Sequence, residues 1–174
     1  MSSIIISAIL ILIVIVICLA LVSINNKHRE KAADELLSRF QKLAQENDLT
    51  ISGREILENF IIGLDKEQLK ILFLKKEDDK YHSLVINLKE VRNSSKKKIY
   101  RSVNMGTGKK ERMETHIDKI VLEFNLIDKR DAVHIPFYES ERNHSLEMRE
   151  LENKARDWEV ILTTTINKEL KKTA

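Results

Sequence analysis

The most extended pattern in the chain is a run of apolar residues near its start. Residues 4–24 read IIISAILILIVIVICLALVSI, with no charged residue and no proline. A helix of about 20 apolar residues crosses the hydrocarbon core of a bilayer, and a helix is the only single segment that satisfies its own backbone there. We therefore predict a transmembrane anchor over residues 1–25.

The residues that flank this run predict its orientation. Lys27, Arg29 and Lys31 follow it closely, and no lysine or arginine precedes it. Because positive charge stays on the cytoplasmic side, we expect a single-pass protein of the inner (plasma) membrane, with its N-terminus outside and its C-terminal domain in the cytoplasm. The chain's one cysteine, Cys18, lies within the run. A cleaved signal peptide fits less well, because its apolar stretch is about 7–15 residues long.

Residues 26–48 carry a second pattern, with apolar residues at three- and four-residue steps. This spacing predicts an amphipathic connector helix. Three uses of its apolar face are open: packing on the chain's own domain, a short coiled coil between neighbouring chains, or contact with lipid. Charges of both signs on the polar face argue against the third. The coiled coil would make a homo-oligomer through Leu36, Leu37, Phe40 and Leu43.

Over residues 49–174 apolar and polar positions mainly alternate, which predicts antiparallel strands. We expect a turn or short helix at 52–57. Strands then end at about 64 and span about 69–75, 81–91, 96–103, 116–127 and 133–138. From Ser145 the period changes to that of a long amphipathic helix, with Ser145 as its N-cap. The predicted fold class is α+β, an antiparallel sheet or barrel of six to seven strands closed by a C-terminal helix.

This order of elements resembles the pleckstrin-homology-like fold, as used in bacterial membrane-associated proteins of unknown role. The segments that carry the resemblance are FIIGLDKEQLKILFL (60–74), HSLVINLKEV (82–91), IDKIVLEFNLI (117–127), AVHIPFYES (132–140) and ARDWEVILTTTI (155–166). Trp158 resembles the tryptophan that members place on the inward face of the closing helix. The resemblance implies a bent, partly open barrel of about seven strands, plugged at one end by that helix, over residues 49–174.

The resemblance also carries functional expectations. Members that bind phosphoinositides have basic residues around the first hairpin, where this chain offers Lys66 and Lys70 but no following arginine pair. The likeness therefore implies binding of proteins or peptides, or a scaffolding role, more than binding of inositol lipids. A fold alone does not assign a function.

Charge is nearly balanced overall, with one-third of the residues charged and a net charge of +3, so nothing global favours nucleic acid as a partner. One local stretch is strongly basic. It is a candidate contact for anionic phospholipid or an acidic partner, since each basic residue near an anionic leaflet contributes about 1 kcal/mol. Its candidate residues are Lys96, Lys97, Lys98, Arg101, Lys109, Lys110 and Arg112.

No catalytic motif is present, and the five histidines lack metal-ligand spacing. We expect no catalytic residue, no metal and no cofactor. The sequence favours a membrane-anchored cytoplasmic binding or scaffolding module, which recruits an unknown protein or contacts anionic lipid. One alternative is a structural subunit that oligomerises through the anchor and connector helix, and a weaker one is an enzyme with an unfamiliar site.

Overall fold

The computed structural model describes residues 15–17, 30–78, 80–104, 113–127 and 131–173. The chain divides into two compact units, the first containing Met1–Asp65 and Leu72–Val85, the second Lys66–Ile71 and Ile86–Ala174. The predicted anchor lies outside the described residues, except for helical, exposed residues 15–17. Within the part of the chain that the structure describes, no helix has both the length and the apolar character needed to cross a bilayer.

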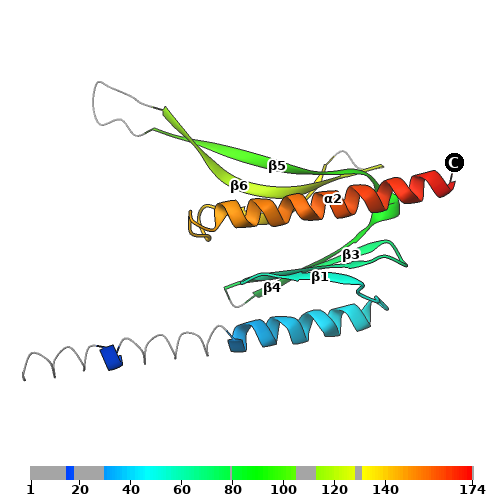
Figure 1. The fold of residues 1–174 in the computed structure, drawn as a ribbon, viewed down its shortest axis with the longest axis horizontal. Helices are drawn as coiled ribbons and strands as arrows, with labels where there is room; N and C mark the ends of the chain where they lie inside the picture. Colours follow the sequence, from blue (N-terminus) through cyan, green and yellow to red (C-terminus); the bar gives the residue numbers. More distant parts are fainter. Residues whose placement is uncertain (1–14, 18–29, 79, 105–112, 128–130, 174) are drawn as a thin grey trace, which may run out of the picture. The chain divides into compact units, whose positions relative to one another are not determined.

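The first unit consists of a helix over residues 30–46 and most of a four-stranded antiparallel sheet of order β1-β2-β3-β4. The strands are β1 (Gly53–Ile56), β2 (Phe60–Asp65), β3 (Lys70–Glu77) and β4 (Lys80–Asn87). The helix runs along one face of this sheet (Figure 1). Both central strands are buried almost throughout, and the helix covers the face that carries Ile61, Leu72 and Leu74.

The end of the 30–46 helix directs the chain into the sheet. Asp48 has the left-handed backbone (φ 54°) of a residue just beyond a helix C-terminus. The N–H of Leu49 donates to the carbonyl of Ala44 at 2.8 Å, and the N–H of Asp48 donates to that of Gln45 at 3.1 Å. This pair of bonds is the Schellman motif, and buried Leu49 supplies its usual apolar contact.

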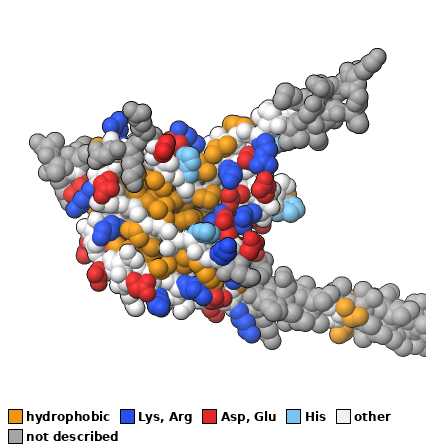
Figure 2. Space-filling model, turned by 180° about the vertical axis from the view of Figure 1, so that it is seen from behind, with side chains coloured by type: hydrophobic (Ala, Val, Ile, Leu, Met, Phe, Trp, Pro, Cys, Tyr) orange, Lys and Arg blue, Asp and Glu red, His pale blue; other side chains and the backbone are white. Residues whose placement is uncertain are grey.

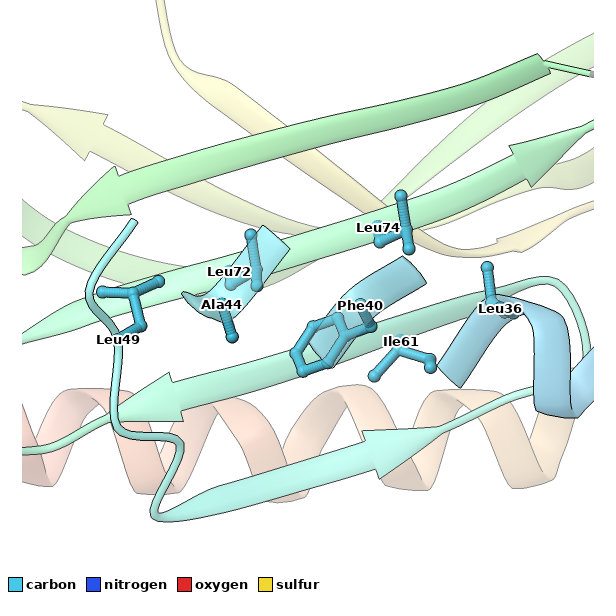
Figure 3. Close-up of a cluster of buried hydrophobic side chains, with 7 residues drawn as sticks. All are labelled: Leu36, Phe40, Ala44, Leu49, Ile61, Leu72 and Leu74. Carbon is cyan, nitrogen blue, oxygen red and sulfur yellow. The ribbon is translucent and has the colours of Figure 1, made fainter. Parts of the chain in front are cut away.

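The helix and sheet of the first unit share one hydrophobic core (Figure 3). Its buried members come from both elements and from the segment that joins them: Leu36, Phe40, Ala44, Leu49, Ile61, Leu72 and Leu74. The helical members recur every four residues, and Leu72 and Leu74 lie on one face of β3, as the two periodicities require. Outside this core, the rings of Phe60 and Phe73 pack with centroids 5.4 Å apart.

The second unit holds a three-stranded antiparallel sheet of order β5-β6-β7 and a long helix packed along it (Figure 1). Its elements are a 3-10 turn η1 (Leu88–Glu90), β5 (Val91–Asn104), β6 (Met113–Leu126), β7 (Val133–Glu139) and α2 (Met148–Thr173). The buried stripe of α2 has the predicted three- and four-residue spacing, at Leu151, Ala155, Trp158, Leu162 and Ile166. Trp158 thus faces inward.

The α+β class is confirmed, but several finer expectations are wrong. Residues 53–56 form an edge strand rather than a turn or helix. The strand expected at 81–91 is interrupted by η1, and α2 begins at Met148 rather than after Ser145. The described strands form two separate sheets, and neither sheet is closed into a barrel. Pro136 lies on the edge strand β7 at a register shift, where its missing backbone donor is tolerated.

Candidate functional site

The basic stretch forms most of β5, where consecutive residues point to opposite faces, so Lys96 and Lys98 share one face and Lys97 lies on the other. Lys96 and Lys98 share one carboxylate of α2: their Nζ atoms lie 2.6 Å and 2.9 Å from the two oxygens of Glu152. The backbone N–H of Lys96 also donates to Glu159 at 2.8 Å. Hydrogen bonds, first from Lys96 and then from Lys98, lower the pKa of Glu152 to about 2. These lysines therefore fasten α2 to the sheet.

The other two described members of the basic stretch are paired as well. Lys97 Nζ lies 2.6 Å from Glu123, a buried carboxylate that His134 also approaches to 3.1 Å. The hydrogen bond from Lys97 is the largest of the effects that lower the pKa of Glu123. Arg101 bridges two carboxylates, at 2.9 Å and 3.2 Å: Glu141 and Asp118. Its pKa is raised, first by the hydrogen bond to Glu141.

These ion pairs reduce the net positive charge that the basic stretch can present to a lipid or to an acidic partner. Each of its four described candidates already has an acidic partner within the chain, so their charge is largely compensated before any lipid approaches. The other three, Lys109, Lys110 and Arg112, lie outside the described residues. On the face shown in Figure 2, cationic and acidic side chains are interspersed. Sequence reasoning missed this pairing because Glu123 and Glu152 are remote along the chain.

The four candidates for oligomerisation all contribute to the first unit's own core. Leu36 and Phe40 are each 1% exposed within the cluster drawn in Figure 3. Leu37 and Leu43 pack against that cluster. Of the three uses expected for this apolar face, packing on the chain's own domain is the one that the structure has. A coiled coil through the same residues would require the helix to leave its sheet.

A polar cluster fixes the same helix at its outer edge. The hydroxyl of Tyr81 on β4 donates to Glu35 at 2.7 Å, and the guanidinium of Arg39 lies 4.1 Å from the centre of the Tyr81 ring. Lys76 Nζ is 3.9 Å from Glu35. The hydrogen bond from Tyr81 is the largest cause of the lowered pKa of Glu35. The helix is thus held by both apolar and polar contacts.

The second unit contains a cavity of about 490 Å³. Its walls come from the turn before β3, from η1, from the start of β5, from the end of β6 and from the C-terminal half of α2. The lining residues are Leu69, Leu88, Lys89, Val91, Arg92, Ile127, Ile166 and Glu169. The volume falls within the range of about 300–1,000 Å³ that is typical of small-molecule sites, which are likewise mainly apolar with a few polar groups.

Backbone hydrogen bonds hold the walls of this cavity in place. Leu69 has a left-handed backbone (φ 56°), and its carbonyl accepts from the N–H of Leu88 at 2.7 Å. The N–H of Ile127 donates to the carbonyl of Glu90 at 2.8 Å. The side chain of Asn87 caps η1 by accepting from the N–H of Lys89 at 3.2 Å. A bulky residue with positive φ is strained, and such residues persist where the surroundings over-determine them.

The polar groups of the cavity are two cations and one carboxylate. Lys89 and Arg92 are exposed, and Glu169 is half-buried. The strand predicted over residues 81–91 included Lys89, and Arg92 follows it directly, so neither residue pointed to a cavity. The missed signal is the sequence NLKEV (87–91), where an asparagine cap starts η1 without any glycine or proline to mark the break.

Among the described residues, no three His, Cys, Asp or Glu side chains are grouped so that they could hold a metal ion. The cavity itself offers an apolar surface beside three charged side chains. Comparison of the chain with protein-family models, with curated proteins and with solved structures found no match.

Proposed function

We propose that this chain is a membrane-anchored recognition module, in which residues 4–24 span the plasma membrane and the folded part binds a ligand on the cytoplasmic side. The observation that carries recognition is the apolar cavity of about 490 Å³ with Lys89 and Arg92 among its lining residues. Of the two kinds of partner that the sequence favours, this cavity suits an anionic lipid better than a protein, because it is concave and of small-molecule size.

The proposed anchor brings the folded part close to the bilayer. The apolar run ends at residue 24 and the described helix is present from residue 30, which leaves five residues between them. Even fully extended, five residues span at most about 18 Å. Confinement of this kind raises the effective concentration of any ligand that is itself in the membrane, without adding a contact.

Anchoring is tested by fractionation of cells that express the full chain. We expect the protein in the membrane fraction after an alkaline wash and its release by detergent alone. Val14→Arg places a charge at the middle of the span, at a cost of about 2.5–3.5 kcal/mol on insertion scales, and should reduce recovery in membranes. The matched change Thr163→Arg lies on an exposed position of α2 and should not. Recovery of the unmodified chain in the soluble fraction would overturn the proposal.

Recognition through the cavity is tested in native membranes with a photoreactive amino acid. When the photoreactive amino acid replaces Ile127, on the exposed part of the cavity wall, we expect adducts of lipid mass. When it replaces Leu146, which is 84% exposed and does not line the cavity, we expect no such adducts. Equal adducts at both positions, or protein-sized adducts alone at position 127, would contradict a lipid site.

We also propose that the fold belongs with the pleckstrin-homology-like architecture. Support comes from seven described strands in antiparallel order followed by one long C-terminal helix, which is the order that the resemblance implies. An experimental structure that gives the mutual arrangement of the two sheets tests this, and two sheets that share no bent, partly open barrel would contradict it.

A further inference from the structure

We infer that the cavity of the second unit binds a single-chain carboxylate amphiphile, a free fatty acid, with its acyl chain inside and its carboxylate at Lys89 and Arg92. This inference rests on the proposed function for the route by which the ligand arrives. It goes beyond that function by naming the ligand's chemical class.

The apolar lining selects an acyl chain. Leu69, Leu88, Val91 and Ile166 are almost fully buried, yet all four border the same open space. Protein interiors are otherwise packed with few voids larger than a water molecule. A space of this size that is walled by aliphatic side chains gains most from a flexible, unbranched apolar group, which adapts to it without needing a hydrogen-bond partner.

The charges select a carboxylate. Lys89 and Arg92 contribute two positive charges and Glu169 one negative charge, so the lining carries one net positive charge. A monoanion balances that charge. A phosphomonoester, with about −1.5 to −2 charges near neutral pH, would bring surplus negative charge towards Glu169. Arginine is also suited to a carboxylate because its planar guanidinium donates two parallel hydrogen bonds.

The same two cations are available to a ligand. Lys96, Lys97, Lys98 and Arg101 each have an acidic partner in the chain. By contrast, the described residues include no ion pair for Lys89 or Arg92, and both are exposed beside apolar surface. A free fatty acid reaches such a site from the membrane, where it is concentrated by partition of its chain.

The experiment uses the full chain in phosphatidylcholine nanodiscs and a 16-carbon fatty acid with a photoreactive group near its tail. Peptide mapping should find label on the segments that contain Leu88–Arg92 and Ile166. Unlabelled palmitate should compete, and the photoreactive fatty alcohol of equal length should label about tenfold less, because it lacks the charge-assisted hydrogen bonds.

Matched variants separate the two parts of the site. Lys89→Gln with Arg92→Gln should reduce labelling by about tenfold. Arg149→Gln with Arg156→Gln removes the same charge from exposed positions of α2 outside the cavity and should not. Ile127→Trp partly fills the cavity from its exposed wall and should abolish labelling, whereas Leu146→Trp should leave it unchanged. Fluorescence of buried Trp158 in the charge variants, and circular dichroism in all of them, reports that the second unit remains folded.

Several results would overturn the inference: equal labelling by acid and alcohol, no effect of the paired charge variants, or stronger labelling by a two-chain phospholipid analogue. Failure of the proposed function is read separately. A chain that is not retained in the nanodiscs lacks the anchor, whatever its labelling pattern, and a retained chain without cavity labelling fails only as a fatty-acid site.

Discussion

Replacement of Gly63 by alanine tests whether the N-terminal helix is seated on its own sheet. Gly63 lies on β2 beneath Phe40 of the helix. A Cβ added there would be 2.6 Å from Phe40 Cζ and 3.1 Å from Ile51 Cγ2. Real Cβ atoms essentially never show the first distance, so the ring or the strand must move.

The size of the effect follows from how little space the ring has. Ordinary contact begins at 3.4 Å, so Phe40 must retreat by 0.8 Å (3.4 − 2.6) while it is 1% exposed inside a packed cluster. Overpacking of a core costs about 1–3 kcal/mol. The alanine recovers about 0.4–1 kcal/mol by restricting the unfolded chain. We expect a net loss of about 1–2 kcal/mol, a factor of about 5–30 in the opening equilibrium.

Hydrogen exchange of the full chain in nanodiscs measures this loss locally. Amides of the 30–46 helix should exchange faster in Gly63→Ala, whereas those in the middle of α2 should not. Gly53→Ala is the matched control, because nothing lies within 4 Å of a Cβ added on β1. Phe40→Leu removes the ring atoms that would clash with the alanine Cβ. Its destabilisation should therefore be at least about 0.5 kcal/mol smaller in the Gly63→Ala background than in the unmodified chain. Equal exchange in the two glycine variants would refute the seating of the helix and restore the coiled-coil alternative.

Three further substitutions test the second unit and the β3–β4 hairpin. Glu152→Gln should lower the free energy of unfolding by about 1–3 kcal/mol, because two charge-assisted bonds weaken. Since the pKa of Glu152 is depressed to about 2, its stabilisation is present above the unfolded value near 4.5 and is lost as pH falls towards 2. Urea titrations followed by Trp158 fluorescence should therefore show a smaller difference in unfolding free energy between the variant and the unmodified chain in acid than at neutral pH. An equal difference in acid and at neutral pH would contradict the pairing. Trp158→Ala should cost about 3–5 kcal/mol by circular dichroism, against little for Val160→Ala at a 60% exposed position; similar losses would contradict the assigned face of α2. Asp78→Gly should raise the opening free energy of the β3–β4 hairpin, measured by hydrogen exchange, by about 0.5–1 kcal/mol, because Asp78 has φ 52° and glycine adopts positive φ without strain. If Asp78→Gly were no more stable than Asp78→Ala, the left-handed backbone at this position would be contradicted.

Elements whose pattern is local and regular could be predicted from the sequence. The stripe of α2 has the spacing of one helix face, and the strand predicted at 116–127 corresponds to β6, whose Ile120, Leu122 and Phe124 are buried. Pro136 lacks a backbone donor, which restricts it to an edge strand or a bulge, and β7 is an edge strand. In each case the physical constraint acts within a few residues, so the sequence displays it.

Elements that depend on a remote partner could not be predicted in the same way. Ser52 and Glu55 have the spacing of a capping box, yet Gly53–Ile56 pairs with β2 as an edge strand. Pairing across a sheet overrides a weak helix signal, because local propensity is small beside tertiary contacts. The break at η1 is hidden for a related reason: Leu88 continues the alternation of β4 and is buried, so its side chain gives no sign that the backbone has turned.

The basic stretch shows how far a run of like charge can mislead about a surface. Its sign is visible in the sequence, but its surface potential depends on which acidic residues the fold brings to it. Glu152 is 56 residues from Lys96 along the chain and 2.6 Å from it in space. Four of the seven predicted cations therefore form ion pairs between elements of the second unit. Paired charges attract a lipid surface only weakly. Lys89 and Arg92 carry fewer charges in total, but both line the cavity and neither has an ion pair among the described residues. On this reasoning, ligand binding should respond more to two substitutions at the cavity than to four on β5.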